Sequence, residues 1–411
     1  MFVIYDREKQ RKPIKVWLDS ISDLEESCLE QAYHLANLPF LFKHVALMPD
    51  THTGYGMPIG GVIALKEAII PNAVGNDIGC GVAFIHTDID VNELNKSLIQ
   101  EIVEEILKAI PTGFEHQKAK KSSPVLTSAK DELVANLGKA NPSINFLYNE
   151  IDRAYYQTGT LGGGNHFIEL QKDEDGKLGI MVHSGSRNLG YQICRYFNKV
   201  AQELREKWPV KIRSEWQLSY LPVSSVEGQS YIQWMNLALN FAQENRQNMM
   251  DKVIEIITNK VRPFRIELKI NAHHNYAAVE DHFGKEVWVH RKGAIRARKG
   301  EPGIIPGAMG SYSYIVEGLG NPESFCSCSH GAGRRMGRKE AKRQFSTEQV
   351  LTDLKDQNII LGTKDQHGVV DECRFAYKNI DTVIENEKDL VKPVMKLRTL
   401  AVVKGSEKKR G

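Results

Sequence analysis

The stretch FKHVALMPDTHTGYGMPIGGVIALKEAIIPNAVGNDIGCGVAFIHT, residues 42–87, alternates short β-rich runs with glycine turns. This alternation is typical of strands that are joined by tight loops. The last of these loops, GNDIGCGV, places Asp77 and Cys80 between glycines. The stretch therefore predicts a sheet whose connecting loops carry reactive side chains.

Three further islands beside glycine carry histidines: His166 in GGGNHFIEL, His183 in MVHSGSRNLG and His274 in NAHHNYAAVE. One such cysteine or histidine alone is more often a buried core residue than a ligand. Glycine neighbours, however, let the backbone approach a ligand closely. A thiolate with imidazoles and a carboxylate suits Zn, Mn, Fe or Co better than Mg or Ca. We therefore expect a transition-metal site, for which His273 is an alternative ligand to His274.

The length and composition limit the class of protein. The 411 residues exceed one typical core, so we expect one elaborate domain or two lobes around a cleft. With 41% hydrophobic and 26% charged residues, and no apolar run long enough to span a bilayer, the chain reads as a soluble protein. Charges interrupt the amino-terminal MFVIYDREKQRKPIKVW, so we expect no export and a cytoplasmic location.

The cysteines and the net charge exclude other classes. Six unevenly spaced cysteines are too few for a disulfide framework, and no CxxC pair indicates a structural zinc site. A formal net charge of +3 says little about nucleic-acid binding, so any electrostatic argument must come from local clusters.

Apolar periodicity predicts helices over residues 92–110, 126–138, 230–261 and 380–389, with a polar loop over 114–130. The longest of these ends before Pro263. Strands and loops are expected between them, and LRTLAVVKG, residues 397–405, is expected as a final strand. No linker or low-complexity segment divides the chain, which favours one composite α+β unit.

A different island, CSCSHGAGRRMGRKEAKRQ, places His330 before two glycines and a basic stretch. Glycine amides, arginine side chains and a helix amino terminus all suit phosphate, and a neutral imidazole can form a covalent phosphoramidate. A solvated basic helix face after a turn is the equally weighted alternative. The flanking Cys326 and Cys328 are assigned to packing. Neither a P-loop nor a Rossmann fingerprint is present.

Taken together, GNDIGCGV, GGGNHFIEL, HSGSRNLG, HHNY, HRKGA, SHGAGR and a terminal VVKG resemble, in this order, the RtcB family of GTP-dependent RNA ligases. The likeness runs from about residue 40 to about residue 405. It implies one composite domain over residues 1–405 with mixed sheets, surrounding helices and a central metal-containing cleft. Residues 406–411 would be a basic, disordered tail.

The resemblance also implies an activity. The family joins an RNA 3′-phosphate, or a 2′,3′-cyclic phosphate after its opening, to a 5′-hydroxyl in RNA repair or tRNA splicing. It uses GTP and two Mn(II) ions, and it proceeds through a GMP–histidine intermediate and a GMP-activated RNA 3′ end. His330 matches the histidine that is guanylylated, and Cys80 would bridge both ions. The implied metal ligands are Asp77, Cys80, His166, His183 and His274.

The resemblance assigns further residues to GTP and to RNA. Asn165 and Arg334 would hold the GTP phosphates, while Glu169, Tyr377 and Lys404 would contact the guanine. Ala308 also lies in the nucleotide site, where the family often has serine, so one hydrogen bond to the guanine would be missing. The SHGAGR island also follows PGAMG at a slightly shorter spacing than expected. The residues assigned to RNA binding are Asp50 in MPDTHTGYG and Arg187.

Two other functions remain open from the residues alone. A metal-dependent cyclic phosphodiesterase would need the metal ligands but neither His330 nor Lys404. A nonenzymatic RNA-end binder would tolerate the loss of Cys80. His52 and His290 are expected near the cleft, either facing RNA or as structural residues. The expected partners are GTP and RNA from nicked tRNA or rRNA; the need for an activator protein and the oligomeric state stay open.

Overall fold

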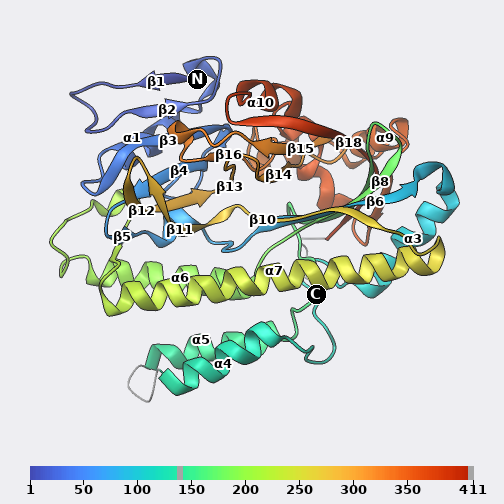
Figure 1. The fold of residues 1–411 in the computed structure, drawn as a ribbon, viewed down its shortest axis with the longest axis horizontal. Coiled ribbons are helices and arrows are strands. Elements are labelled where there is room, and N and C mark those ends of the chain that lie inside the picture. The colour runs from blue at the N-terminus through green and yellow to red at the C-terminus, as the bar shows by residue number, and fades with distance from the viewer. Residues whose placement is uncertain (137–141, 406–411) are drawn as a thin grey trace.

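Two large sheets form the body of the protein, and helices surround them (Figure 1). The computed structural model describes residues 1–136 and 142–405. Both sheets mix parallel and antiparallel pairs, so the predicted α+β class with mixed sheets is confirmed. The tail predicted for residues 406–411 lies outside the described residues.

The first sheet has six strands and holds the amino-terminal part of the chain. Its neighbours pair antiparallel except for β2 and β3, which run parallel. In spatial order the strands are β1 (Phe2–Ile4), β2 (Ile14–Val16), β3 (Leu41–His52), β4 (Ile59–Leu65), β12 (Lys285–Lys292) and β11 (Asn275–His282).

The second sheet has eight strands and brings together distant parts of the sequence. Seven of them lie in the order β10 (Ile266–His273), β6 (Gly81–Asp90), β8 (Lys177–Ser184), β7 (Phe167–Lys172), β18 (Val391–Lys404), β15 (Tyr312–Gly318) and β14 (Pro302–Ile305). The eighth, β17 (Ile360–Thr363), pairs parallel to β18. The carboxy-terminal strand β18 therefore lies inside the sheet, between β7 and β15.

Two short sheets and ten α-helices complete the described structure. The short sheets pair β13 (Ala294–Arg296) with β16 (Ser327–Ser329) and β5 (Ala68–Ile69) with β9 (Leu221–Pro222). The helices are α1 (Glu26–Ala36), α2 (Pro71–Val74), α3 (Lys96–Ala109), α4 (Pro124–Asn136), α5 (Pro142–Ala154), α6 (Arg187–Leu204), α7 (Val226–Lys260), α8 (Arg338–Gln344), α9 (Thr347–Asp356) and α10 (Ile380–Asn386).

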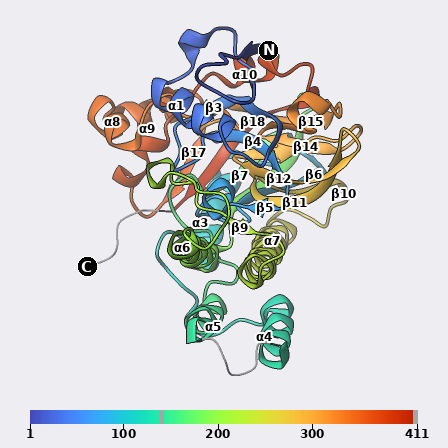
Figure 2. The same ribbon diagram turned by 90° about the vertical axis from the view of Figure 1, so that its left-hand side faces the viewer.

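The long helix α7 supports the second sheet from one side. It packs beside α6 and against β6 and β8, while α4 and α5 lie beyond this helix layer (Figures 1 and 2). Its predicted start at residue 230 is four residues late, because the Ser225 hydroxyl accepts the Gly228 amide and caps the helix earlier. Apolar side chains of α7, including Met249 and Val253, pack with strand residues such as Ile180 in one core cluster.

Other predicted elements agree in part. The helix expected over 92–110 is α3, the one over 380–389 is the shorter α10, and the final strand begins earlier, at Val391. The prediction of a polar loop over 114–130 is wrong after Ser123. The hydroxyl of Ser123 accepts the Leu126 amide at the start of α4. Residues 137 and 138 of the helix expected over 126–138 lie outside the described residues. Among residues 1–136 and 142–405, no helix is both long and apolar enough to cross a membrane.

Candidate active site

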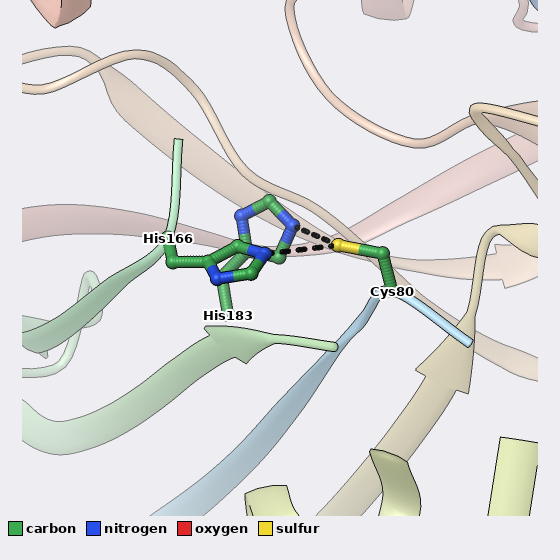
Figure 3. Close-up of side chains that lie close together, drawn as sticks. All are labelled: Cys80, His166 and His183. Atoms are coloured by element: carbon green, nitrogen blue, oxygen red, sulfur yellow. Dashed lines mark hydrogen bonds between the residues drawn. The ribbon is translucent and has the colours of Figure 1, made fainter. Parts of the chain in front are cut away.

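A thiol and two imidazoles meet at one end of the second sheet. Cys80 directly precedes β6, His166 directly precedes β7, and His183 lies on β8. The Cys80 Sγ lies 3.4 Å from His166 Nε2 and 3.3 Å from His183 Nε2 (Figure 3). All three side chains are buried, and their potential ligand atoms lie within 4.8 Å of one another. Ligands that share a metal with bonds of about 2.0–2.3 Å lie at such separations.

Asp77 and His274, the other two predicted ligands, border this cluster. Asp77 Oδ2 lies 3.1 Å from His166 Nε2. Burial alone would raise the pKa of Asp77, but the hydrogen bond and charge of His166 hold it below the ordinary value. The His274 ring lies 5.2 Å from the His183 ring, and its buried Nδ1 has no hydrogen-bond partner among the described residues. An unpaired buried nitrogen beside a thiol and imidazoles is chemically suited to bind a cation.

The protonation states in this cluster suit metal binding. Burial, and then the neighbouring histidines, lower the pKa of His183 and His274 well below the ordinary value, so both rings are neutral at pH 7. The His166 Nδ1 donates to the Leu161 carbonyl at 2.9 Å, which directs Nε2 toward Cys80 and Asp77. The alternative ligand His273 instead faces Arg246 and the Gly79 carbonyl.

The glycines of the islands give the close approach that the sequence indicated. A Cβ on Gly185 would lie 2.4 Å from Asp77 Oδ1. A Cβ on Gly162 would lie 1.9 Å from Arg187 Nη1 and 2.7 Å from His166 Nδ1. A side chain at either position would therefore displace a predicted site residue.

Arg246 of α7 is a buried residue that the sequence analysis missed. Its guanidinium donates to the carbonyls of Gly79 and Ser184 at 2.8 Å and to Asn271. Burial lowers the pKa of Arg246 to about 10, and the nearby Cys80 and Asp77 oppose that shift. Its position inside a regular helical pattern gave no signal, because the loops that it ties together are distant in sequence.

His330 follows β16 and lies against the metal cluster. Its ring lies 4.7 Å from that of His274, and its Nδ1 donates to Asp50 Oδ2 at 2.6 Å. The same oxygen accepts the His330 backbone amide at 3.1 Å. Asp50, which the resemblance assigned to RNA binding, is 0% exposed and contacts the His330 ring. A proton held on Nδ1 leaves the Nε2 lone pair available.

A cleft of about 210 Å³ opens beside His330 and His183. His52 also lines this cleft, whereas His290 faces the backbone of Ile70 and Trp288. The residues that the resemblance assigned to the nucleotide all line the cleft: Asn165, Glu169, Ala308, Arg334, Tyr377 and Lys404.

The cleft wall contains a buried carboxylate, Glu372, that the sequence analysis missed. It accepts from Arg334 at 3.3 Å and from the Tyr377 hydroxyl at 2.7 Å, and it lies 3.7 Å from Lys404 Nζ. Burial would raise the pKa of Glu372, but Lys404 and Arg338 hold it below the ordinary value. Nothing in DQHGVVDEC marks this residue, because its partners Arg334 and Lys404 are distant in sequence.

Arg187, the remaining predicted RNA residue, lines a second cavity of about 550 Å³. Its guanidinium donates to the Thr160 hydroxyl and to the Gly113 carbonyl. The other lining residues are aromatic, basic or amide side chains: Phe114, His116, Arg153, Tyr156, Gln157 and Asn188. Arg187 therefore lies apart from the nucleotide cleft but next to the loop that carries His166.

Comparison with known proteins gives this arrangement a family. The family model described as tRNA-splicing ligase RtcB matches residues 31–405. The RNA-splicing ligase RtcB of Escherichia coli (strain K12) is 39% identical over 407 residues, which cover 96% of this chain and 98% of that protein. The tRNA-splicing ligase RtcB of Thermococcus kodakarensis is 32% identical, covering 97% and 96%. The protein whose cluster, cleft and second cavity are described above thus belongs to the RtcB family.

Proposed function

We propose that this chain joins an RNA 3′-phosphate, or a 2′,3′-cyclic phosphate after its opening, to a 5′-hydroxyl through a GMP–histidine intermediate. GTP would be the co-substrate and Mn(II) the metal. The relatives, named as RNA-splicing and tRNA-splicing ligases, support the ligase class. The observation that carries the proposal is the position of His330, which lies between the Cys–His cluster and the cleft that holds every predicted nucleotide residue.

The donor set fits the predicted metals. Cys80, His166, His183, Asp77 and His274 offer one thiolate, neutral imidazoles and a carboxylate, and the unpaired His274 Nδ1 supports a cation there. When bound, the ions would withdraw electron density from phosphate oxygens and neutralise charge during transfer.

His330 would act as the nucleophile. Asp50 holds the proton on Nδ1 and orients the ring, so Nε2 can attack the α-phosphorus of GTP. The Nε2–P bond forms while the bond from phosphorus to the pyrophosphate oxygen breaks, and pyrophosphate leaves. An oxygen of the RNA 3′-phosphate then displaces His330 and takes the GMP group. Finally the 5′-hydroxyl oxygen attacks the RNA phosphate, its proton is lost, and GMP leaves.

The cleft residues would bind and orient GTP. Arg334 and Asn165 would hold phosphates, whereas Glu169, Lys404 and Tyr377 would contact the guanine. Glu372 fixes both Arg334 and Tyr377, so it would set their geometry. Burial raises the pKa of Glu169 to about 7, and hydrogen bonds from Thr399 and Gln171 oppose that shift. Ala308 offers no hydroxyl to the base.

The second cavity would receive an RNA strand. Its Arg187 and Arg153 can neutralise phosphates, while Phe114 and Tyr156 present exposed aromatic faces to bases. The cavity offers charged groups and stacking faces, so the phosphate backbone and the RNA end would dominate recognition.

The test is covalent labelling with α-³²P GTP and Mn(II). Wild-type protein should form an acid-labile, alkali-stable adduct, and His330→Ala should form none. His34→Ala, a substitution on α1 outside the site, is the control and should label like the wild type. Labelling that survives in His330→Ala would remove His330 as the nucleophile. Opening of cyclic phosphate ends without any adduct would favour the phosphodiesterase alternative.

A further inference from the structure

Two consecutive backbone amides at the nucleophile donate to buried carboxyl groups from different elements. The His330 amide donates to Asp50 of β3 at 3.1 Å, and the Ser329 amide donates to Glu387 Oε2 at 2.8 Å. Glu387 directly follows α10, 58 residues away in the sequence. The backbone that carries the histidine is therefore held between β3 on one side and the end of α10 on the other.

Glu387 is an unusual buried carboxyl because it forms no salt bridge with a cation in residues 1–136 and 142–405. It is 0% exposed, and the groups that influence its charge are Ser329, Asp50 and Asp389. Burial raises the pKa of Glu387 to about 8; the Ser329 amide opposes the shift, and the charge of Asp50 adds to it. The side chain is therefore largely a neutral acid at pH 7, with one proton to donate.

Three buried oxygens in this region have no hydrogen-bond partner among the described residues. They are Glu387 Oε1, the Ser329 hydroxyl and Asp50 Oδ1. Buried oxygens are rarely left unpaired, and a neutral acid supplies a donor that an ionised one lacks. The proton of Glu387 gives the side chain a donor, which an apolar side chain of the same size lacks.

We propose that Glu387, as a neutral acid, is a positioning residue for the nucleophile His330. This inference rests on the proposed function, because it presumes that His330 attacks GTP. Glu387 accepts the Ser329 amide without carrying a negative charge. Asp50, the other carboxyl of this region, carries the charge and binds the imidazole. Without this contact the 329–330 backbone loses one of its two anchors, and Nε2 is less often aligned with the α-phosphorus.

The experiment measures adduct formation at saturating GTP in Glu387→Leu and Glu387→Gln. Leucine fills similar space without a hydrogen bond, whereas glutamine keeps the carbonyl acceptor and a donor. We expect Glu387→Leu to slow adduct formation roughly 10- to 100-fold with an unchanged KM for GTP. Glu387→Gln should stay within about threefold of the wild type. The exposed neighbour Glu385, changed to Leu, is the matched control.

Thermal melting of each variant separates positioning from folding. A Glu387→Leu protein that is folded at the assay temperature and labels at the wild-type rate would overturn the positioning role alone. Equal slowing of adduct formation in the Leu and Gln variants would also overturn the positioning role. A neutral side chain with the same acceptor and a donor would then fail to replace the acid. If the wild-type protein forms no adduct, the proposed function itself fails and this inference fails with it.

Discussion

The imidazoles toward the two ends of the paired strands β6 and β8 face different partners. At one end the Cys80 thiol lies beside His166 and His183, and His274 Nδ1 has no hydrogen-bond partner among the described residues. At the other end His86 Nε2 lies 2.8 Å from Asp173 and its Nδ1 lies 3.2 Å from Glu267. A carboxylate offers hydrogen-bond acceptors to an imidazole, whereas a metal needs a lone pair from it. The partners therefore separate a candidate metal ligand from a hydrogen-bonded structural histidine.

Removing the thiol should have the largest effect on this comparison. Cys80→Ala should lower adduct formation with GTP and Mn(II) at least about 100-fold, because both imidazoles lose their shared neighbour. Metal content by mass spectrometry and labelling with α-³²P GTP measure the two effects. Cys326→Ala, outside the cleft, should behave like the wild type. Full labelling by Cys80→Ala would refute the shared-thiolate arrangement.

The other end of the strands should respond in stability and not in chemistry. His86→Ala should lower the free energy of unfolding by about 1–3 kcal/mol, because it removes the buried imidazole that contacts the Asp173 carboxyl. Adduct formation should persist at temperatures where the variant is folded. Urea unfolding measures the first effect. An unchanged unfolding midpoint would contradict the structural role of His86. A folded variant that fails to form the adduct would show that His86 also affects the chemistry.

A smaller effect should come from pH at a neutral histidine outside both clusters. His290 Nε2 accepts the Ile70 amide and Nδ1 donates to Trp288, and burial lowers the pKa of His290 to about 4. Its folded pKa lies below the unfolded value near 6.5, so the unfolded chain binds more protons between those values. The stability that neutral His290 contributes is therefore present above pH 6.5 and is lost as pH falls toward 4.

The corresponding measurement compares wild type with His290→Gln at pH 7 and pH 5. Glutamine can accept and donate without titrating, so its loss of unfolding free energy between these pH values should be smaller by about 1–2 kcal/mol. Equal losses in both proteins would show that His290 does not couple folding to protons. In the wild type and in His290→Gln alike, His183 and His274 should stay neutral at pH 7.

The sequence indicated which residues belong to the site more reliably than it indicated which partners those residues contact. Cys80, His166 and His183 stood out because glycines flank them, and the structure brings them together. Long periodic segments such as α7 were found. Helices α1, α5, α6 and α9 were not, although α6 buries Leu189, Ile193 and Phe197 at helical spacing. Glu372 and Glu387 gave no local signal, since a carboxyl gains a role only from partners folded next to it.

Asp50 is a residue that the sequence analysis singled out without predicting its contact. The resemblance assigned it to RNA binding, and only the three-dimensional contact shows that it holds the His330 ring. The direction of a side chain follows from strand pairing, and β3 is distorted by register shifts near this residue. A short motif cannot reveal such a shift.

The interior place of β18 bears on how the chain is made. A ribosome releases residues 391–404 after it has released the seven other strands of the eight-stranded sheet. This strand must nevertheless insert between β7 and β15. Until then both neighbours present unpaired edges, which invite aggregation during synthesis. Lys404, on that same strand, arrives last as well. The cleft wall to which Lys404 belongs is therefore incomplete until this strand has inserted, and aggregation is the main risk in this final interval.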